Sequence, residues 1–262
     1  ARFHCTLLTT KELDLLNTGK VVEYFSNNSF DFVVNCAAYT AVDKAEVELE
    51  LNDRLNNLVV ETLADLCRKQ DAFFIHISTD FVFDGTKCSP LIESDITNPL
   101  QAYGRAKLKG EASVTKGIVL RTSWLYSPYG NNFVKTMLRL GSEREQLNVV
   151  NNQIGTPTYA YDLARVIVAI CLDKKYKEKN GVYHMSNEGV ASWYDFACSI
   201  MEYGKKDCVV KPISDSAFPT AAKRPNYSVL DKTKIKEQFG IEIHYWRDSL
   251  KQCINIIKEH ER

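Results

Sequence analysis

The sequence predicts an α/β fold in which the strands of a parallel sheet alternate with helices. Three segments, 30–38, 73–77 and 117–122, are continuous apolar runs of strand length, as expected for strands that are buried on both faces of a parallel sheet. Residues 56–69, between the first two runs, carry apolar side chains at helical spacing. The order strand, helix, strand is typical of a parallel sheet with crossover helices.

The same patterns predict the later elements. We expect a helix that starts near 98–99 and carries residues 103–107, a helix over 133–140 and a strand over 146–150. A helix over 162–172 and a last sheet strand at 181–186 follow. Ser192 and Asp195 have the spacing of a capping box, which predicts a helix reaching Tyr203. A strand at 209–213 and helices at 231–239 and 245–259 close the chain, and 84–99, with two prolines, is expected to be a surface loop.

Composition excludes several functional classes. The 262 residues contain 33 Lys and Arg against 33 Asp and Glu, so the formal net charge is zero. Proteins that bind nucleic acids or membrane surfaces are usually basic, so we expect neither partner. No apolar run approaches the length of a membrane span, and no secretory signal pattern opens the chain.

Eight cysteines, none in a Cys-x-x-Cys pair, fall mostly inside apolar segments. This usage is typical of small buried hydrophobic residues in a reducing compartment, so we expect a cytoplasmic protein without disulfides or a cysteine metal site. His76, in the second apolar run, is expected to be a hydrogen-bonded core residue rather than a ligand or a base.

The most informative segment runs from 73 to 107. An apolar strand ends in Ser78, Thr79 and Asp80, and Tyr103 and Lys107 follow one helical turn apart. Residues i and i+4 of a helix share a face, and an ammonium beside a phenol lowers the phenol pKa. Tyr103 is therefore suited to give a proton to an oxygen that gains charge. A Tyr-x-x-x-Lys pair also arises by chance on exposed surface helices, so the preceding strand carries the argument.

Several motifs carry a resemblance to a known family. They are Asn-Cys-Ala-Ala-Tyr-Thr-Ala-Val-Asp-Lys-Ala-Glu at 35–46, Ser-Thr-Asp-Phe-Val-Phe-Asp-Gly at 78–85, Arg-Thr-Ser-Trp-Leu-Tyr at 121–126, Gln-Ile-Gly-Thr-Pro-Thr at 153–158 and Arg-Pro-Asn-Tyr-Ser-Val-Leu at 224–230. In this order they resemble the dTDP-4-dehydrorhamnose reductases, which belong to the extended short-chain dehydrogenase/reductases. The resemblance implies a Rossmann-type, doubly wound parallel sheet with a smaller α/β substrate-binding lobe. It places the dinucleotide-binding domain at 1–186, with 125–160 contributing to the substrate site, and the small lobe at 187–262.

One part of that fold does not match the start of the chain. A dinucleotide-binding domain normally opens with a strand, a Gly-rich turn and a helix whose amino terminus holds the pyrophosphate. Residues 1–34 contain a single glycine, Gly19. We therefore expect the domain to be incomplete at its amino terminus, with roughly 30 residues, the length of such a unit, lying upstream.

The activity that the resemblance implies is reduction of the C4 keto group of dTDP-4-dehydro-L-rhamnose to dTDP-L-rhamnose by NADPH or NADH, the last step of dTDP-rhamnose biosynthesis. The catalytic residues it implies are Tyr103, Lys107 and Thr79. The cofactor-binding residues are Asp14, Leu15, Ala38, Tyr39, Thr40, Ile77, Tyr103 and Lys107. The substrate-binding residues are Thr79, Asp80, Trp124, Asn132 and Arg224. Arg224 is expected to clamp the substrate diphosphate, and Arg121 to be structural.

Alternatives remain open at this point. Related nucleotide-sugar dehydratases carry Glu where this chain has Phe81, so water elimination lacks its acid. A non-catalytic regulatory homologue, like the regulatory subunit of methionine adenosyltransferase, shares the resemblance, and so does a reductase or epimerase acting on another nucleotide-linked deoxysugar. Some relatives use Mg²⁺, but the sequence indicates no metal site. It leaves open whether the chain is a monomer or a homodimer.

Overall fold

A four-stranded parallel sheet forms the centre of the molecule. The computed structural model describes residues 3–260. Its main sheet has the order β1-β2-β3-β8, formed by β1 (Phe32–Asn35), β2 (Phe73–Thr79), β3 (Gly117–Thr122) and β8 (Gly181–His184). Every neighbouring pair is parallel. The α/β fold with a parallel central sheet, expected from the apolar runs, is therefore confirmed.

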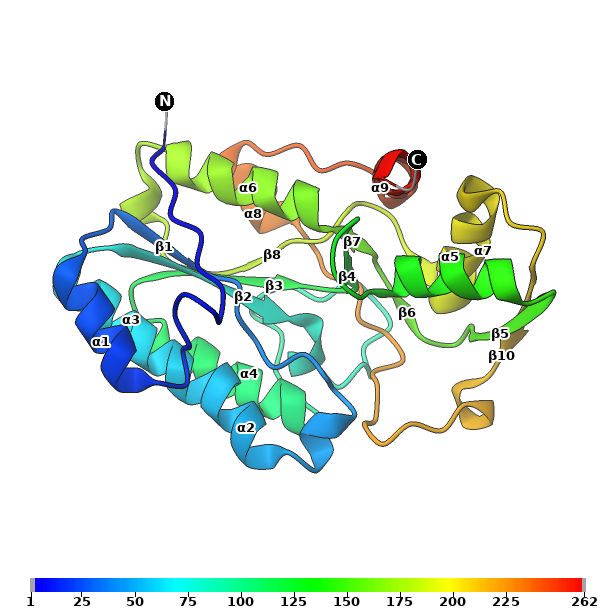
Figure 1. Cartoon of the computed structure of the whole chain (residues 1–262), viewed down its shortest axis with the longest axis horizontal. Helices are drawn as coiled ribbons and strands as arrows, with labels where there is room; N and C mark the ends of the chain where they lie inside the picture. The colour runs from blue at the N-terminus through cyan, green and yellow to red at the C-terminus, as the bar shows by residue number, and fades with distance from the viewer. Residues whose placement is uncertain (1–2, 261–262) are drawn as a thin grey trace.

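Helices cover both faces of this sheet (Figure 1). One face packs against α1 (Thr18–Asn27), α3 (Val59–Gln70) and α4 (Ala102–Ser113), and the other against α6 (Ala160–Leu172) and α8 (Thr233–Phe239). The period of two in a strand distributes β2 between these layers. Phe73 and Ile75 join the core beneath α6, whereas Phe74 joins the core beneath α1 and α3. His76 lies on the same side as Phe74, and this register turns it toward α4.

Two sequence expectations need correction here. The helix expected from residue 56 begins earlier, as α2 (Leu49–Asp53), and continues through a π-helical turn, η2 (Arg54–Leu58), into α3. The run 30–38 forms only the short β1, and Val34 is 38% exposed rather than buried. Side chains of a strand point to the faces of the sheet, so Val34 is exposed because the face of β1 that carries it is only partly covered; β1 is also an edge strand, since among residues 3–260 it pairs only with β2. No strand, Gly-rich turn and helix unit precedes β1 in this range, and the expected upstream unit stays a prediction.

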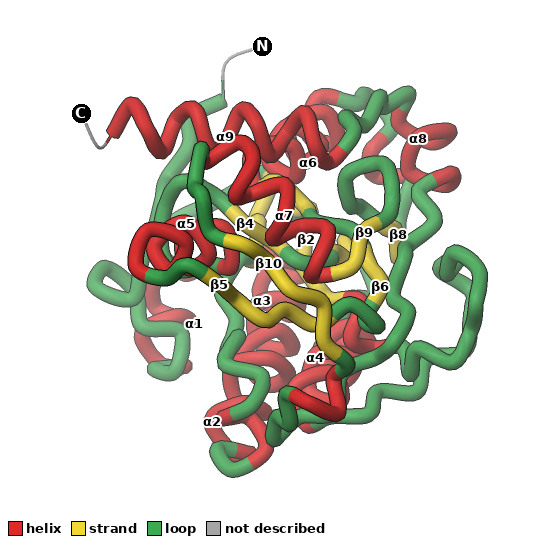
Figure 2. Tube along the Cα trace, turned by 90° about the vertical axis from the view of Figure 1, so that its right-hand side faces the viewer, coloured by secondary structure: helices red, strands yellow, loops and turns green. Residues whose placement is uncertain are grey.

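A second, smaller body lies beside the sheet (Figures 1 and 2). In it, α5 (Phe133–Glu143), α7 (Trp193–Gly204) and α9 (Trp246–His260) pack with a parallel pair of strands, β5 (Gln146–Val150) and β10 (Val209–Ile213). Its apolar core draws residues from two separate stretches, 126–159 and 191–257. The division of the chain into domains after residue 186 stays a prediction.

Short elements complete the chain. Two pairs of two-residue strands are β4 (Leu125–Tyr126) with β7 (Thr158–Tyr159) and β6 (Ile154–Gly155) with β9 (Ala191–Ser192). Within residues 3–260 the short 3-10 helices are η1 (Lys44–Glu46), η3 (Asp80–Val82), η4 (Tyr176–Glu178) and η5 (Asp215–Ala217). The capping box predicted for α7 is confirmed, because the Ser192 and Asp195 side chains each accept a hydrogen bond from the backbone N–H of the other.

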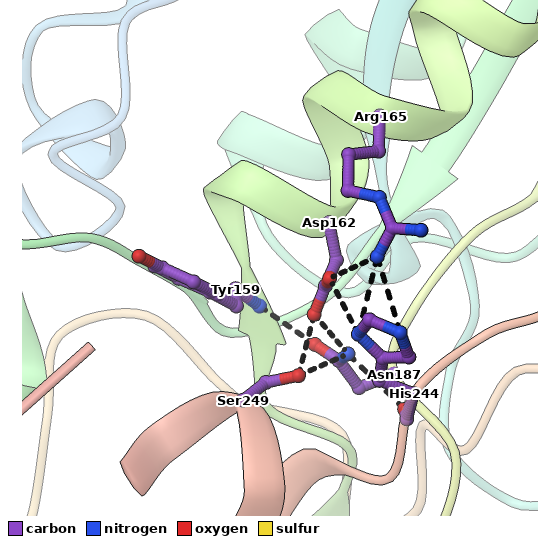
Figure 3. Close-up of polar contacts among 6 residues, drawn as sticks. All are labelled: Tyr159, Asp162, Arg165, Asn187, His244 and Ser249. Carbon is purple, nitrogen blue, oxygen red and sulfur yellow. Dashed lines mark hydrogen bonds and ion pairs between the residues drawn. The ribbon is translucent and has the colours of Figure 1, made fainter. Parts of the chain in front are cut away.

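A buried polar cluster joins the sheet body to the small body (Figure 3). The Asp162 carboxylate on α6 is 5% exposed, and its Oδ2 accepts hydrogen bonds from Asn187 Nδ2 at 2.7 Å and from Ser249 Oγ at the start of α9. Asn187 Oδ1 in turn accepts from the Tyr159 backbone N–H at 2.7 Å. His244 Nδ1 lies 3.1 Å from Asp162 Oδ1. These contacts fix where α9 starts relative to α6.

The cysteines only partly match the sequence expectation. Cys67, Cys208 and Cys253 are buried, but Cys5, Cys36 and Cys88 are exposed, because they lie in loops or at the end of β1. All eight are free thiols. Within the described range, each helix is too short or too polar to span a bilayer.

Candidate active site

Tyr103 and Lys107 lie on the first two turns of α4, on the face that is turned toward the carboxyl end of β2. The helix begins after Gln101, whose extended backbone follows the loop containing Pro99. Tyr103 is 9% exposed, Lys107 1% and Thr79, the last residue of β2, 6%. The structure therefore brings the three expected catalytic residues to one edge of the sheet, where parallel α/β folds bind their ligands.

The protonation of Tyr103 differs from the sequence expectation. Burial raises the pKa of Tyr103 to about 12, the charge of Asp80 also raises it, and a hydrogen bond with Thr79 acts in the opposite direction. The expected lowering of this pKa by Lys107 is absent. Lys107 Nζ is instead directed to the strand, where it donates to the Ile77 carbonyl oxygen at 2.6 Å.

Lys107 also contacts His76. The two side chains meet at Nζ and Nε2, 3.2 Å apart, and the other ring nitrogen of His76 lies 3.2 Å from Asn35 Nδ2. Burial lowers the pKa of Lys107 to about 8, while the charges of Glu111 and Cys36 act to raise it. The expectation that His76 is a hydrogen-bonded core residue is confirmed. Sequence patterns did not indicate that its partner is the candidate catalytic lysine.

Asp80 follows Thr79 at the carboxyl end of β2 and lies beside the candidate catalytic residues. It is 2% exposed, and Thr79 Oγ1 lies 3.2 Å from Asp80 Oδ1. Burial raises the pKa of Asp80 to about 6, and hydrogen bonds with Ser228 and Thr79 oppose this shift.

The expected cofactor residues line the carboxyl end of β1. Cys36 and Ala37 are exposed and Ala38 is half-buried, so the small side chains leave the backbone open to a flat ring. The loop is held from beneath by Asn56, which accepts from the Tyr39 backbone N–H at 3.1 Å and donates to the Tyr39 carbonyl at 2.9 Å. Asn56 lies in the π-helical turn and is fully buried. The sequence analysis missed it, and no local pattern marks it.

The other expected cofactor residues are exposed or half-buried. Thr40 is exposed, and the Tyr39 hydroxyl donates to Glu48 at 2.7 Å. Asp14 is exposed and forms a turn in which its Oδ1 accepts from the Leu16 N–H at 3.0 Å, with Leu15 half-buried beside it. Ile77 contributes the carbonyl that Lys107 contacts.

The residues present fit a nicotinamide nucleotide. A buried lysine at the strand ends supplies a donor for ribose hydroxyls, and the open backbone of β1 admits a flat ring. Gln101, two residues before Tyr103, is 1% exposed, and its side-chain oxygen and nitrogen have no hydrogen-bond partner among residues 3–260. A buried amide of this kind suits a site that takes a polar ligand.

The expected substrate residues are less uniform. Trp124 has a positive φ of 48° and stacks on Trp193, with ring centroids 3.7 Å apart. Asn132 caps α5: its side chain accepts from the Lys135 N–H at 3.2 Å and donates to the Ser127 carbonyl at 2.8 Å. This amide is therefore already engaged within the protein.

Arg224 makes an ion pair rather than standing free. Its Nη2 lies 2.6 Å from Asp43 Oδ2, and the guanidinium also donates to the Ala222 carbonyl. The pKa of Asp43 is held below its usual value by the hydrogen bond from Arg224. Asp43 follows the 38–40 segment closely, so this pair joins the loop that contains Ala222 and Arg224 to the candidate cofactor segment.

Arg121 is confined to the core, as expected for a structural residue. Its side chain is 5% exposed and pairs with Glu111, which is 4% exposed, through Nη2 and Oε2 at 2.7 Å. Ser78 Oγ donates to the same carboxylate at 2.5 Å. The pair fixes α4 to β2 and β3 behind Tyr103 and Lys107.

Comparison with known proteins identifies the family. The family profile described as "RmlD substrate binding domain" matches residues 1–259. A dTDP-4-dehydrorhamnose reductase of Aggregatibacter actinomycetemcomitans is 41% identical, over 95% of this chain and 89% of the relative. The chain belongs to the dTDP-4-dehydrorhamnose reductase family.

Other members agree with this assignment. The Escherichia coli K12 reductase is 38% identical, over 92% of this chain and 85% of its own. Among solved structures, a dTDP-4-dehydrorhamnose reductase of Clostridium acetobutylicum superposes with a TM-score of 0.90 at 40% identity, covering 95% of this chain and 89% of that one. A Bacillus anthracis family member in complex with NADP has the same TM-score and coverage at 36% identity.

Among residues 3–260, no group of three or more His, Cys, Asp or Glu side chains is arranged to hold a metal ion.

Proposed function

We propose that this chain reduces the C4 keto group of dTDP-4-dehydro-L-rhamnose to dTDP-L-rhamnose with a nicotinamide cofactor. The observation that carries the proposal is the convergence of Thr79, Tyr103 and Lys107 at the carboxyl edge of the sheet, in a chain of this family. The relatives named as reductases favour this activity over a non-catalytic binding role.

The proposed chemistry needs one proton. A bound dihydronicotinamide would supply the hydride, and charge would build on the carbonyl oxygen. With its pKa raised to about 12, Tyr103 keeps its proton at neutral pH and is present as the donor. Thr79 offers a hydroxyl to the same oxygen, which stabilises the charge as it forms.

The cofactor is proposed to bind across the ends of β1 and β2. Ala38, Tyr39 and Thr40 would line the ring and ribose, Ile77 and Lys107 would lie beneath, and Asp14 and Leu15 would contact the remote end. The Bacillus anthracis relative contains NADP. We propose a nicotinamide cofactor for this chain and leave the preference between NADPH and NADH to the assay below.

Substrate binding is proposed to involve Arg224, Trp124, Asp80 and Asn132. Arg224 is the candidate for the diphosphate, because a guanidinium can contact phosphate oxygens in a bidentate way. It would exchange Asp43 for the phosphate, a swap that keeps the arginine paired throughout. Arg224→Ala is expected to raise KM severalfold with a smaller change in kcat, and an unchanged KM would reject this role.

The decisive experiment follows oxidation of NADPH and, separately, NADH while dTDP-4-dehydro-L-rhamnose is generated in place. Tyr103→Phe should lose roughly 10²- to 10⁴-fold in rate while remaining folded. Tyr161→Phe is the matched control, because Tyr161 is 60% exposed on α6 and should leave the rate unchanged. Near-normal turnover by Tyr103→Phe would refute the assignment.

The same assay separates the alternatives. Oxidation with another nucleotide-linked deoxysugar but not with this substrate would favour a related reductase. Cofactor binding without turnover of any sugar would favour the regulatory role. A cytoplasmic location and a homodimeric state remain part of the proposal, to be tested by fractionation and by light scattering.

A further inference from the structure

A directional chain of hydrogen bonds leads from the backbone at the end of β1 to Lys107. The Ala37 N–H lies 3.1 Å from Asn35 Oδ1, Asn35 Nδ2 lies 3.2 Å from His76 Nδ1, and His76 Nε2 lies 3.2 Å from Lys107 Nζ. Asn35, His76 and Lys107 are 4%, 0% and 1% exposed, so the two side-chain contacts that link them are shielded from water.

Which atom donates and which accepts in each hydrogen bond of this chain follows from the first one, between Ala37 and Asn35. A backbone N–H can only donate, so the atom of Asn35 that it meets must be the amide oxygen. The amide nitrogen then faces His76 and donates to Nδ1, which is left without a proton. A neutral imidazole carries one proton, so that proton lies on Nε2.

The contact between His76 Nε2 and Lys107 Nζ then sets the protonation state of the lysine. An Nε2–H group donates, and Lys107 Nζ can accept only as the neutral amine, which still donates to the Ile77 carbonyl at 2.6 Å. With an ammonium at this position, two donors would face each other, or the ring would move its proton to Nδ1 and oppose the Asn35 amide. Either arrangement loses a buried hydrogen bond.

We propose that Asn35 and His76 are positioning residues that hold Lys107 as a neutral amine until a ligand draws its Nζ away from the imidazole. An acceptor such as a ribose hydroxyl pair would release Nζ from Nε2 and allow it to become an ammonium. Because burial lowers the pKa of Lys107 to about 8, this switch operates above about that pH, where Lys107 would be charged beside Tyr103 only when the nucleotide is bound. This role of Lys107 rests on the proposed function, whereas the chain of hydrogen bonds does not.

The surroundings agree with this assignment. Burial lowers the pKa of His76 well below its usual value, and Lys107 also lowers it, so the ring is neutral across the working range. The titratable groups around Lys107 are Cys36 at the end of β1, His76 on β2, and Tyr103 and Glu111 on α4. Glu111 is already paired with Arg121.

The first test is ¹⁵N NMR of histidine-labelled protein without nucleotide at pH 8.5, since imidazole ¹⁵N shifts distinguish N–H from bare nitrogen. We expect His76 to carry its proton on Nε2, with Nδ1 bare. The opposite tautomer, or a doubly protonated ring, would overturn the proposal.

The second test reverses the donor and acceptor roles in the hydrogen bonds of His76. In Asn35→Asp the carboxylate accepts from both the Ala37 N–H and a protonated Nδ1, so Nε2 becomes an acceptor and favours the ammonium. The pKa of Lys107, followed by the ¹³Cε shift and assigned with Lys107→Met, should rise by about one unit or more. Asn28→Asp, at an exposed site, is the matched control and should leave it unchanged.

An unchanged tautomer and Lys107 pKa in Asn35→Asp would refute the proposal. Because neither measurement uses turnover, a chain without reductase activity but with the expected tautomer would reject the proposed function and leave this inference intact.

Discussion

The buried pair of Glu111 and Arg121 offers a sharp test of how the site is supported. Three N–H···O contacts join them: Nε to Oε1 at 3.0 Å, Nε to Oε2 at 3.2 Å and Nη2 to Oε2 at 2.7 Å. Both side chains are about 95% buried, at 5% and 4% exposed. Glu111→Gln keeps the shape of the side chain but leaves a guanidinium buried without its counter-charge.

The expected cost follows from that uncompensated charge. Breaking one side of a buried ion pair typically costs about 3–5 kcal/mol, a large part of a total stability of about 5–15 kcal/mol. The double variant Glu111→Leu with Arg121→Met removes both charges and should cost far less than the sum of the single changes.

Urea unfolding, with the transition midpoint and its slope measured for each variant, checks this. Glu143→Gln is the matched control: its ion pair with Arg139 lies on α5 with side chains 50% and 61% exposed, so its loss should cost less than about 1 kcal/mol. A cost of Glu111→Gln no greater than that of Glu143→Gln would refute this expectation. So would a double variant whose cost equals the sum of the costs of Glu111→Leu and Arg121→Met measured separately.

Three further predictions concern the fold. Gly85→Ala should destabilise by about 1–3 kcal/mol in thermal unfolding, because φ is +76° and a Cβ would lie 2.5 Å from Pro225 Cβ; Gly130→Ala, with φ +63° and open space, should cost less. Asp162→Ala removes the acceptor of the buried Ser249 hydroxyl and one of the acceptors of Asn187 Nδ2, and should cost about 1–3 kcal/mol in urea unfolding; a cost below about 1 kcal/mol would contradict the role of the cluster. Burial lowers the pKa of His184 to about 3, below the unfolded value of about 6.5, so the unfolded chain binds the extra proton and stability falls as pH drops between these values. His184→Gln should reduce that slope by up to about 1.4 kcal/mol per pH unit, and an unchanged slope would show that His184 does not contribute to it.

Local patterns were sufficient for most of the fold. Apolar runs predicted β2 and β3, and the spacing of Ser192 and Asp195 predicted the start of α7, because these signals depend on neighbours within one turn or one strand. The early start of α2 and the exposure of Val34 were not predictable. They depend on the π-helical turn and on how much of the Val34 face of β1 the rest of the fold covers, and both are features of tertiary packing.

The candidate site likewise has features that the sequence determined and features that only folding produced. The sequence by itself determined that Tyr103 and Lys107 share a helix face, since i and i+4 always do. Only the tertiary structure decided that Lys107 meets His76, 31 residues earlier, and that Arg224 pairs with Asp43 across 181 residues. The pKa of Tyr103 was therefore misjudged from spacing alone. A pKa depends on burial and on charges brought close by folding, and neither is encoded in the distance along the chain.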